Sequence, residues 1–374
     1  MISIGITGQA GFIGNHLYNF FGLKKEEVIR IPFQDDYFNY TATLEAFVKQ
    51  CEVIIHLAAL NRHNDPQAIY DTNMLLVNKL IAAMENTKSR PHVLFSSSKQ
   101  EERNNPFGRS KRAGRELLAA WAGKNGASFT GLVIPNVFGP FGNPYYNSVV
   151  ATFCHQVTHG EQTHIDVDAQ LKLIYIRELV EEFYKAITGH RTAAVYNVKH
   201  TAEKKVTEIL KIVNRFMSEY HDNGIFPELH DAFEINLFNT FRCYMDIAGH
   251  YPVKLKMNTD DRGTFVETIQ TQLGGQVSFS TTKPGITRGN HFHTRKIERF
   301  AVIRGKARIQ LRRIGTTEVL NFELDGTEPS YVDMPIWYTH NITNVGEEDL
   351  YTIFWINEFF DPNDPDTYFE NVEL

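Results

Sequence analysis

The sequence is poor in cysteine, in long apolar runs and in clustered basic charge. Its three cysteines, Cys51, Cys154 and Cys243, are odd in number and far apart. This pattern argues against a disulfide framework or a cysteine zinc site and is typical of buried thiols in a reducing compartment. No apolar run approaches the ~18 residues of a membrane span, and no signal peptide precedes the first apolar segment. We therefore expect a cytoplasmic protein with no membrane partner.

The charge balance is mildly acidic. The 374 residues carry 38 lysines and arginines against 44 aspartates and glutamates, which gives a net charge of −6. Basic residues do not gather on any stretch, so a nucleic-acid partner is not expected. The length suggests two domains.

Short apolar runs alternate with helical periods in the first two-thirds of the chain. This alternation predicts an α/β domain over residues 1–243, with a Rossmann-type, doubly wound parallel sheet and helices on both faces. The expected strands are Ile2–Thr7, Val28–Ile31, Val53–Ala59, Val93–Ser97 and Thr130–Ile134, and the expected helices are Asp71–Glu85, Gly108–Ala122, Arg177–Thr188 and Glu203–Met217.

The pattern changes after Arg242 to strands of period two, separated by glycine turns. It predicts an all-β jelly-roll domain over residues 257–374, preceded by a linker over residues 244–256. The expected strands are Thr264–Ile269, Gln276–Thr281, Arg299–Ile303, Ala307–Leu311, Tyr331–Met334 and Leu350–Ile356.

Three glycines follow the first apolar run, at Gly8, Gly11 and Gly14. A strand, a glycine turn and a helix in this order are the context of a dinucleotide-binding site. Gly8 permits the tight turn, Gly11 lets the backbone approach a pyrophosphate, and Gly14 packs the helix against the strand. The diphosphate would then lie on the helix N-terminus, at Phe12 and Ile13.

The spacing G-x-x-G-x-x-G resembles that of the extended short-chain dehydrogenase/reductases. An acidic residue closing the second strand would favour NADH, but none appears before Asp35, and Arg30 is nearby. We therefore expect NADPH, with Arg30 as the partner of its 2′-phosphate; the alternative is that Arg30 is only a surface residue. The small side chains of Ala58 and Ala59 would let the cofactor lie across the end of the third strand.

Asn61 and Arg62 follow the third strand, in the crevice where open α/β sheets bind ligands. Arg62 could meet a substrate diphosphate, although a solvated loop arginine fits these residues equally well. Further along, Pro135, Asn136 and Asn147 match cofactor-loop and substrate-loop positions of the same reductase family.

The catalytic motif of that family is incomplete in this sequence. In extended short-chain reductases a serine bonds the substrate carbonyl, the tyrosine of Y-x-x-x-K donates a proton, and the lysine lowers the pKa of that tyrosine. Ser98 and Lys111 are present here, but Phe107 replaces the tyrosine. Phenylalanine has no hydroxyl and cannot be a general acid.

Four candidate metal ligands lie near the C-terminal end. His291 and His293 are two residues apart and would share one face of a strand, Glu298 follows a turn, and His340 lies in a later segment. Three imidazole nitrogens and a carboxylate oxygen suit zinc, iron, manganese or nickel, and we expect zinc. The order resembles the cupin signature, although Trp337 stands where its second motif has glycine. The alternative is a barrel that packs these histidines without a metal.

The two halves together resemble the CapF-type enzymes of capsular polysaccharide and O-antigen synthesis, which fuse a short-chain reductase to a cupin. The resemblance runs over the whole chain. Its motifs are ITGxxGFxG at Ile6–Gly14, SSSxQ at Ser96–Gln100, NPxGxSK at Asn105–Lys111, PNVFG at Pro135–Gly139, YNSVxATFC at Tyr146–Cys154, DDRGxFxE at Asp260–Glu267, TKPGITRGNHFH at Thr282–His293, YTHNI at Tyr338–Ile342 and FDPNxPDTYF at Phe360–Phe369.

This resemblance implies a bifunctional sugar-nucleotide enzyme. Its cupin would invert C3 of UDP-2-acetamido-2,6-dideoxy-hexos-4-ulose, and its reductase would then reduce the C4 ketone with NADPH to give UDP-2-acetamido-2,6-dideoxy-L-talose. For this chemistry we expect His291 as a base or metal ligand, Tyr338 as the acid that returns the proton, and Arg262 as a partner of the phosphates.

Three interpretations stay open. The first is the bifunctional enzyme. The second, favoured by Phe107, is an epimerase whose reductase half binds nucleotide but no longer transfers hydride. The third is a non-enzymatic sugar-nucleotide binding protein, which the complete set of four metal ligands disfavours. We expect a homodimer, because cupins often cover exposed sheet edges by pairing.

Overall fold

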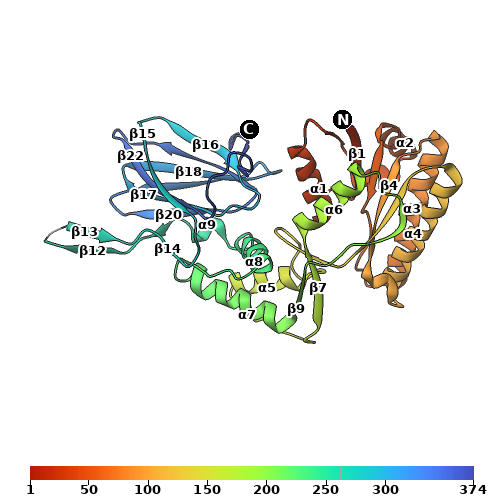
Figure 1. The fold of residues 1–374 in the computed structure, drawn as a ribbon, viewed down its shortest axis with the longest axis horizontal. Coiled ribbons are helices and arrows are strands. Elements are labelled where there is room, and N and C mark those ends of the chain that lie inside the picture. The colour runs from red at the N-terminus through yellow and green to blue at the C-terminus, as the bar shows by residue number, and fades with distance from the viewer. Residues whose placement is uncertain (262) are drawn as a thin grey trace. The chain divides into compact units, whose positions relative to one another are not determined.

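The computed structural model describes residues 1–261 and 263–374, so the predicted substrate residue Arg262 lies outside the described residues. Contacts divide the chain into two compact units, each with its own apolar core (Figure 1). The first unit is Met1–Thr152 with Val167–Val206, and the second unit is Phe153–Asp166 with Thr207–Leu374.

A parallel six-stranded sheet, in the order β2-β1-β3-β4-β5-β8, forms the centre of the first unit. Helices α1 and α6 lie on one face and α2, α3 and α4 on the other (Figure 1). The chain changes direction across the sheet between β2 and β3, which makes the carboxyl ends of β1 and β3 the expected place for a ligand. The strands are β1 (Ile2–Thr7), β2 (Val28–Ile31), β3 (Val53–His56), β4 (His92–Ser98), β5 (Phe129–Ile134) and β8 (Ala193–Asn197), and the helices are α1 (Phe12–Leu23), α2 (Thr41–Gln50), α3 (Pro66–Thr87), α4 (Pro106–Asn125) and α6 (Ile176–Thr188), with short 3₁₀ turns at Asp35–Asn39 and Lys99–Glu102.

Strands β3 and β5 are buried at every position. They lack the alternation of a half-exposed strand because helices cover both faces of a parallel sheet. A smaller sheet in the order β6-β7-β9 completes the unit. Its strands are β6 (Asn136–Phe138), β7 (Gln170–Tyr175) and β9 (Ala202–Lys205).

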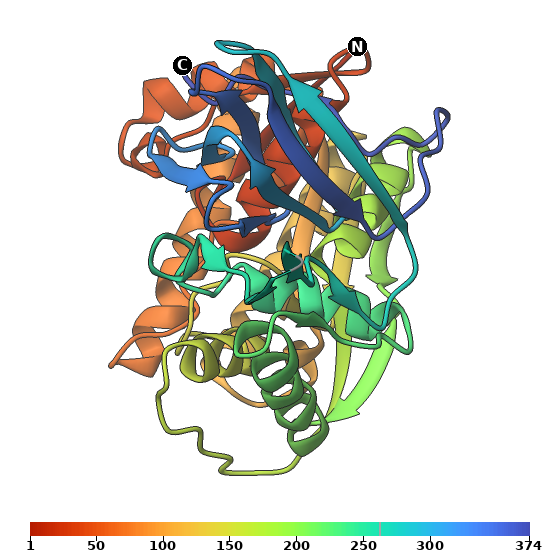
Figure 2. The same cartoon turned by 90° about the vertical axis from the view of Figure 1, so that its left-hand side faces the viewer.

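Two antiparallel five-stranded sheets form most of the second unit (Figure 2, cyan to blue). Their orders are β11-β20-β17-β22-β15 and β19-β18-β21-β16-β23, and apolar side chains of both sheets form one core between them. The first sheet contains β11 (Val253–Lys254), β20 (Ser330–Met334), β17 (Glu298–Arg304), β22 (Leu350–Ile356) and β15 (Gln276–Thr282), and the second contains β19 (Val319–Asp325), β18 (Lys306–Arg313), β21 (Tyr338–Asn344), β16 (Thr287–Phe292) and β23 (Tyr368–Phe369).

The predicted fold class is confirmed: a Rossmann-type parallel α/β sheet is followed by mostly antiparallel sheets in the C-terminal region. Helices also accompany the β-rich unit, and α5 contains residues of both units. None of the helices in the described part of the chain combines the length and apolar character that a membrane crossing needs. The remaining elements are α5 (Val149–Thr158), α7 (Val206–Phe216), the π-helical turn η3 (Met217–His221), α8 (Ala232–Arg242), α9 (Ile247–His250), the pair β10 (Ile225–Phe226) and β14 (Gln270–Thr271), and the hairpin β12 (Met257–Asp260) and β13 (Gly263–Val266).

The segment predicted as a linker, residues 244–256, carries α9 and β11 in the structure. β11 pairs with β20, and Ile247 and Tyr251 are buried in the core between the two sheets. By contacts, residues 207–256 therefore belong to the second unit. The boundaries of two independent domains at 243 and 257 stay a prediction.

A buried polar network joins the helices of the second unit to its first sheet. The guanidinium of Arg299 on β17 donates two hydrogen bonds to Asp333 on β20, at 2.7 and 2.9 Å, and the two residues are each 1% exposed. Tyr220 in η3 donates to the same carboxylate at 2.7 Å and accepts from Arg242 of α8 at 3.2 Å. Every charge in the network has an oxygen or nitrogen partner, which is the condition for burying it.

We predict that Asp333→Asn destabilises the second unit strongly, because it leaves the buried guanidinium of Arg299 without its counter-ion. Loss of one partner of a buried pair costs about 3–5 kcal/mol of the free energy of unfolding. Urea denaturation followed by tryptophan fluorescence measures it.

The matched control is Glu323→Gln. Glu323 pairs with Arg308, and the two side chains are 58% and 48% exposed, so the expected loss is within about 1 kcal/mol. Equal losses for Asp333→Asn and the control would contradict the assigned role of the buried pair.

Candidate functional site

The glycine turn of the first unit has the close contacts that the sequence predicts. Gly8 has a φ of +72°, and a Cβ there would lie 2.9 Å from the Cα of Ala58. A Cβ on Gly14 would lie 2.3 Å from the carbonyl oxygen of Gly8. Glycine is therefore needed at Gly8 for its conformation and at Gly14 for the close approach of helix and turn.

Helix α1 presents its N-terminus at this turn. Gly11 occupies the N-cap position and offers no side-chain acceptor. The backbone N–H groups of Phe12, Ile13 and Gly14 in the first turn are therefore available to an anion. This geometry suits the diphosphate of a dinucleotide.

Arg30 turns toward helix α1. Its Nη1 donates to the carbonyl of Tyr18 at 3.0 Å, and its guanidinium carbon lies 4.2 Å from the centroid of the Tyr18 ring. A role as partner of a 2′-phosphate would require this side chain to leave Tyr18.

Ala58 and Ala59, the small residues predicted to lie beneath the cofactor, are both half-buried just after β3.

The predicted catalytic residues come from two neighbouring elements, β4 and α4. Ser98 ends β4, while Phe107 and Lys111 lie one turn apart on α4. The side chain of Asn105 caps α4 by accepting from the N–H of Gly108 at 2.7 Å. The Nζ of Lys111 lies 5.7 Å from the centroid of the Phe107 ring, so the ring occupies the place of the missing phenol beside the lysine.

Lys111 is buried away from acidic side chains. Its Nζ lies 5.1 Å from the centroid of the Phe95 ring and donates to the Oγ of Ser96 at 3.5 Å. Burial lowers the pKa of Lys111 to about 8, because desolvation disfavours the ammonium. Burial, with the nearby charge of Lys111, also lowers the pKa of His56 to about 3.

Three of the predicted substrate residues come together beyond β3. Arg62 donates from Nε to Asn147 at 3.1 Å and from Nη1 to the carbonyl of Tyr145 at 3.0 Å. Asn61 and Arg62 line an open hollow of about 400 Å³. A fourth predicted substrate residue, Asn136 on β6, lies elsewhere in the structure and donates to the carbonyl of Lys172 at 3.2 Å. Pro135, which was predicted to bind the cofactor, is buried between β5 and β6.

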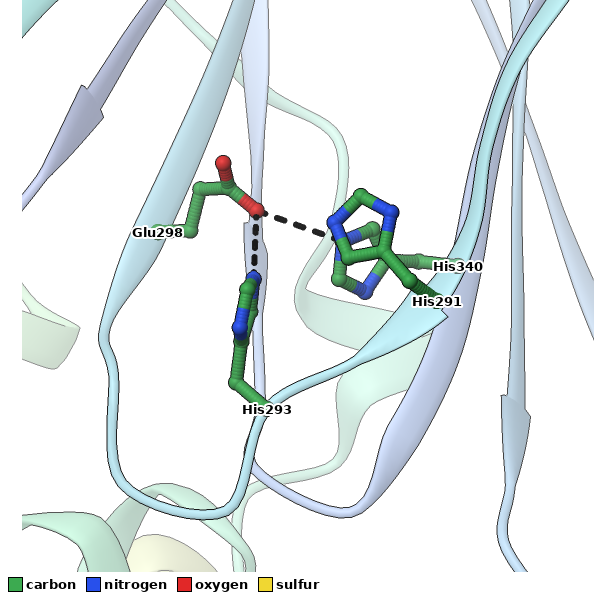
Figure 3. A group of neighbouring side chains, drawn as sticks. All are labelled: His291, His293, Glu298 and His340. Carbon is green, nitrogen blue, oxygen red and sulfur yellow. Dashed lines mark hydrogen bonds and ion pairs between the residues drawn. The ribbon is translucent and has the colours of Figure 1, made fainter. Parts of the chain in front are cut away.

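The four predicted metal ligands form one cluster in the second unit (Figure 3). His291 on β16 pairs across the sheet with His340 on β21, His293 follows β16, and Glu298 begins β17. The Oε2 of Glu298 lies 3.3 Å from the Nε2 of His293 and 3.2 Å from the Nε2 of His340. One ligand atom from each residue lies within 4.8 Å of the others.

Burial and mutual contacts set the protonation of this cluster. Burial opposes ionisation of Glu298, but its contacts with His293 and His340 hold the pKa of the carboxyl well below its usual range. Burial and the neighbouring His340 lower the pKa of His291 to about 4. For His293, the contacts with Glu298 and Asp366 outweigh burial and raise the pKa.

The residues of the cluster fit a divalent metal ion. The Nε2 of His340 is buried. It lies 3.2 Å from the Oε2 of Glu298, but it forms no hydrogen bond of good geometry with any described residue. The Nδ1 atoms of His340 and His293 face the carbonyls of Tyr338 and Asp366, at 3.1 and 2.6 Å, which leaves each Nε2 for a metal. Zinc bonds of roughly 2.0–2.2 Å place donor atoms about 3.5 Å apart. The most widely separated donor atoms of the cluster, up to 4.8 Å apart, would therefore approach one another by about 1 Å when the ion binds.

Trp337, which stands where the second motif has glycine, adopts a backbone conformation that favours glycine. Its φ is +62°, a region that L-residues rarely adopt. Its N–H donates to the carbonyl of His293 at 2.8 Å, and its ring stacks on Phe292 with 5.5 Å between centroids. The departure from the motif therefore leaves the turn beside His293 in place.

Tyr338 and Asp366 complete the surroundings of the cluster. Tyr338 lies two residues before His340 on β21, and its side chain packs against the core between the sheets. Its role as a proton donor stays a prediction. Sequence reasoning missed Asp366, which contacts His293; the only signal was its place in the Asp- and Pro-rich motif at Phe360–Phe369.

The comparisons with known proteins agree with this arrangement. The family model of the NAD dependent epimerase/dehydratase family matches residues 4–198, and that of the polysaccharide biosynthesis C-terminal domain matches residues 258–368. A relative from Pseudomonas aeruginosa, UDP-2-acetamido-2,6-beta-L-arabino-hexul-4-ose reductase, is 32% identical over 365 residues, which cover 97% of either chain. The spore coat polysaccharide biosynthesis protein SpsL of Bacillus subtilis is 26% identical over 30% of this chain and 82% of its own.

A solved structure extends the likeness to the whole chain. The capsular polysaccharide assembling protein CapF from Staphylococcus aureus is 34% identical, with a TM-score of 0.62, and the match covers 99% of this chain and 100% of that one. The chain therefore belongs to the CapF-type family, in which an NAD dependent epimerase/dehydratase domain is followed by a polysaccharide biosynthesis C-terminal domain.

Proposed function

We propose that this chain is a bifunctional sugar-nucleotide enzyme. Its second unit inverts C3 of UDP-2-acetamido-2,6-dideoxy-hexos-4-ulose, and its first unit reduces the C4 ketone with NADPH to UDP-2-acetamido-2,6-dideoxy-L-talose. The observation that carries the proposal is the buried cluster of three histidines and Glu298 on the same chain as the glycine turn. The name of the Pseudomonas aeruginosa relative, a hexul-4-ose reductase, supports the keto-sugar substrate.

Inversion at C3 follows from the chemistry of the ketone. The C4 carbonyl acidifies the proton on C3, because the charge left by its removal spreads onto the carbonyl oxygen. A metal held by the cluster would supply positive charge near that oxygen. With the metal held by His293, Glu298 and His340, His291 would be free to take the proton; it is the only member of the cluster that is not fully buried. Tyr338 would return a proton on the opposite face.

Reduction at C4 needs a hydride from the cofactor and a proton for the new alkoxide. Ser98 would hydrogen-bond the carbonyl oxygen, and Lys111 would hold the cofactor ribose and add positive charge. Phe107 has no proton to give. Arg62, which lines the hollow and donates to Asn147, has the planar fork of donors that suits a diphosphate.

Phe107 favours a second candidate function. In this alternative the second unit epimerises C3, and the first unit binds nucleotide but reduces the ketone poorly. The intact glycine turn and the buried Lys111 beside Ser96 support the first proposal, because an abandoned site would be expected to lose more than one residue.

A homodimer in the cytoplasm is part of the proposal. Strand β15 lies at the edge of its sheet, and its side chains Val277 and Phe279 are 63% and 72% exposed. An exposed edge strand with apolar side chains is a ready template for pairing with another chain. A second copy of the chain would cover this edge.

We predict that the metal-free chain binds about one zinc ion, because the cluster offers three nitrogens and one oxygen. Removing the His340 imidazole in His340→Ala should weaken binding by more than the roughly 10–100-fold that loss of an outer partner costs. Competition with a chromophoric chelator measures the affinity. His164→Ala is the control, since His164 is a surface histidine with an 80% exposed side chain; equal affinity of the two variants would exclude the cluster as the metal site.

NADPH should bind more tightly than NADH. No acidic residue at the end of β2 would repel a 2′-phosphate, and Arg30, near the end of the same strand, could pair with it. Fluorescence titration with both cofactors is the measurement. Arg30→Ala should weaken NADPH binding and leave NADH binding unchanged, while Lys25→Ala, at an exposed lysine, should alter neither. Equal or tighter binding of NADH by the unmodified chain would count against the assignment.

Phe107→Tyr should raise reduction of the keto sugar by about 10²–10⁴-fold, the usual contribution of a general acid. NADPH oxidation measures this step, and solvent-deuterium exchange at C3 measures the other half of the reaction, which should not change. Phe265→Tyr, the same change at a side chain that is 65% exposed, should alter neither activity.

These assays also separate the two candidate functions. Exchange at C3 with slow NADPH oxidation is the outcome that supports the impaired reductase. Fast oxidation by the unmodified chain, unchanged by Phe107→Tyr, would show that another group carries the proton. Loss of both activities would refute the proposed function.

A further inference from the structure

The C-terminal segment Asp361–Phe369 lies against the turn that joins the two halves of the predicted metal site. This turn, His293–Ile297, leads from β16 in one sheet to β17 in the other. His291 and His340 belong to the sheet that contains β16 and β21, Glu298 belongs to the sheet that contains β17, and His293 belongs to the turn itself. The distance between the two halves of the cluster therefore depends on the shape of this turn.

The turn is buried together with its backbone N–H groups. Thr294 and Lys296 are 5% and 2% exposed, and Ile297 is 0% exposed. Buried backbone N–H groups need an acceptor. That acceptor has to come from outside the turn.

Asp366 supplies the acceptor for three consecutive N–H groups. Its carboxylate accepts from the N–H groups of Thr294, Arg295 and Lys296, at 3.2, 2.9 and 3.1 Å, and from the hydroxyl of Thr294 at 2.6 Å. The residue is 2% exposed. The next N–H of the turn, that of Ile297, donates to the side chain of Asn357 at 2.8 Å, so the N–H groups of residues 294–297 are all satisfied.

The same residue also contacts a member of the cluster directly. The carbonyl oxygen of Asp366 lies 2.6 Å from the Nδ1 of His293. When Nδ1 donates to this carbonyl, the Nε2 of His293 is the nitrogen that faces Glu298. Asp366 has a φ of +42°, a conformation that directs its carbonyl and its carboxylate at the same turn and that is uncommon for a residue with a side chain.

The rest of the segment is tied to the turn and to β16. The Nζ of Lys296 donates to the carbonyl of Pro365 at 2.7 Å, and the guanidinium of Arg295 pairs with Asp364 at 2.9 Å. Strand β23, which follows the segment's aspartates, pairs with β16 at His291 and Phe292. The segment therefore holds the turn at several points, with Asp366 as its buried centre.

We propose that Asp366 is a positioning residue of the metal centre: it fixes the turn between His293 and Glu298, and it orients the His293 ring without binding the metal itself. This inference rests on the proposed metal centre. Outer partners that orient metal-binding histidines typically contribute about 10–100-fold to metal affinity. Asp366 contacts His293 directly and the turn that leads to Glu298 through its carboxylate.

The test compares Asp366→Asn with Asp364→Asn in the full-length chain. Asparagine at 366 keeps the shape but replaces one acceptor oxygen by a donor that opposes the N–H groups of the turn. Asp364→Asn makes the same change in the same segment, at a side chain that is 67% exposed. Cobalt(II) is titrated into each metal-free protein. We expect binding about 10–100-fold weaker for Asp366→Asn and within about threefold for Asp364→Asn.

The visible spectrum of the bound cobalt separates positioning from simple stability. At saturating cobalt, a positioning role predicts altered band positions or intensities for Asp366→Asn, because the ligand geometry has changed. A residue that only stabilised the fold would leave the spectrum of the saturated protein unchanged. Thr294→Val, which removes the hydroxyl bond to Asp366, should give a smaller loss of affinity. This variant keeps the test decisive if Asp366→Asn does not fold.

The outcomes distinguish this inference from the proposed metal centre. If the unmodified chain binds no cobalt, the metal centre is wrong and the role of Asp366 falls with it. If the unmodified chain binds cobalt, and folded Asp366→Asn binds it with equal affinity and an identical spectrum, only the role of Asp366 is overturned. Unchanged cobalt binding by Thr294→Val, with Asp366→Asn unfolded, would overturn it as well.

Discussion

Two buried charges on adjacent residues of one strand constrain the second unit. Glu298 and Arg299 follow one another on β17, so their side chains project to opposite faces of the sheet. Glu298 faces the histidine cluster, and Arg299 is neutralised by Asp333 on the neighbouring strand β20, beside Tyr220 of the helical layer. Neither charge can be buried without its partners. The register of β17 is therefore fixed from both sides, and the cluster and the helical layer share a single strand.

Local patterns in the sequence predict the parts of the site that lie close together along the chain. The glycine spacing predicts the turn before α1 because each glycine meets a steric need within a few residues, such as the approach of Gly14 to the Gly8 carbonyl. The pair His291 and His293 is equally local. His340 was predictable because its motif is long, although its partner strand β16 is about 50 residues away.

Features that depend on contacts between distant segments were not predictable. No local pattern around Tyr220 indicates that its hydroxyl donates to Asp333, 113 residues later. The direction of Arg30 depends on the ring of Tyr18 in the neighbouring helix. The role of Asp366 was not predictable for the same reason. A carboxylate in a loop has no sequence pattern that predicts hydrogen bonds to backbone N–H groups 70 to 72 residues earlier in the chain.

The division of the chain into units has a consequence for the order in which it can fold during synthesis. The chain passes between the units three times, after Thr152, Asp166 and Val206. Residues 153–166 leave the ribosome before almost all of the chain with which they pack, so the second half of α5 must wait until residues 207 onward have been made. A truncated product that ends near residue 206 would contain every strand of the parallel sheet. The apolar side chains of Phe153 and Cys154, which are buried in the full chain, would be exposed to solvent in this product. Such fragments are natural clients for chaperones and poor candidates for independent expression.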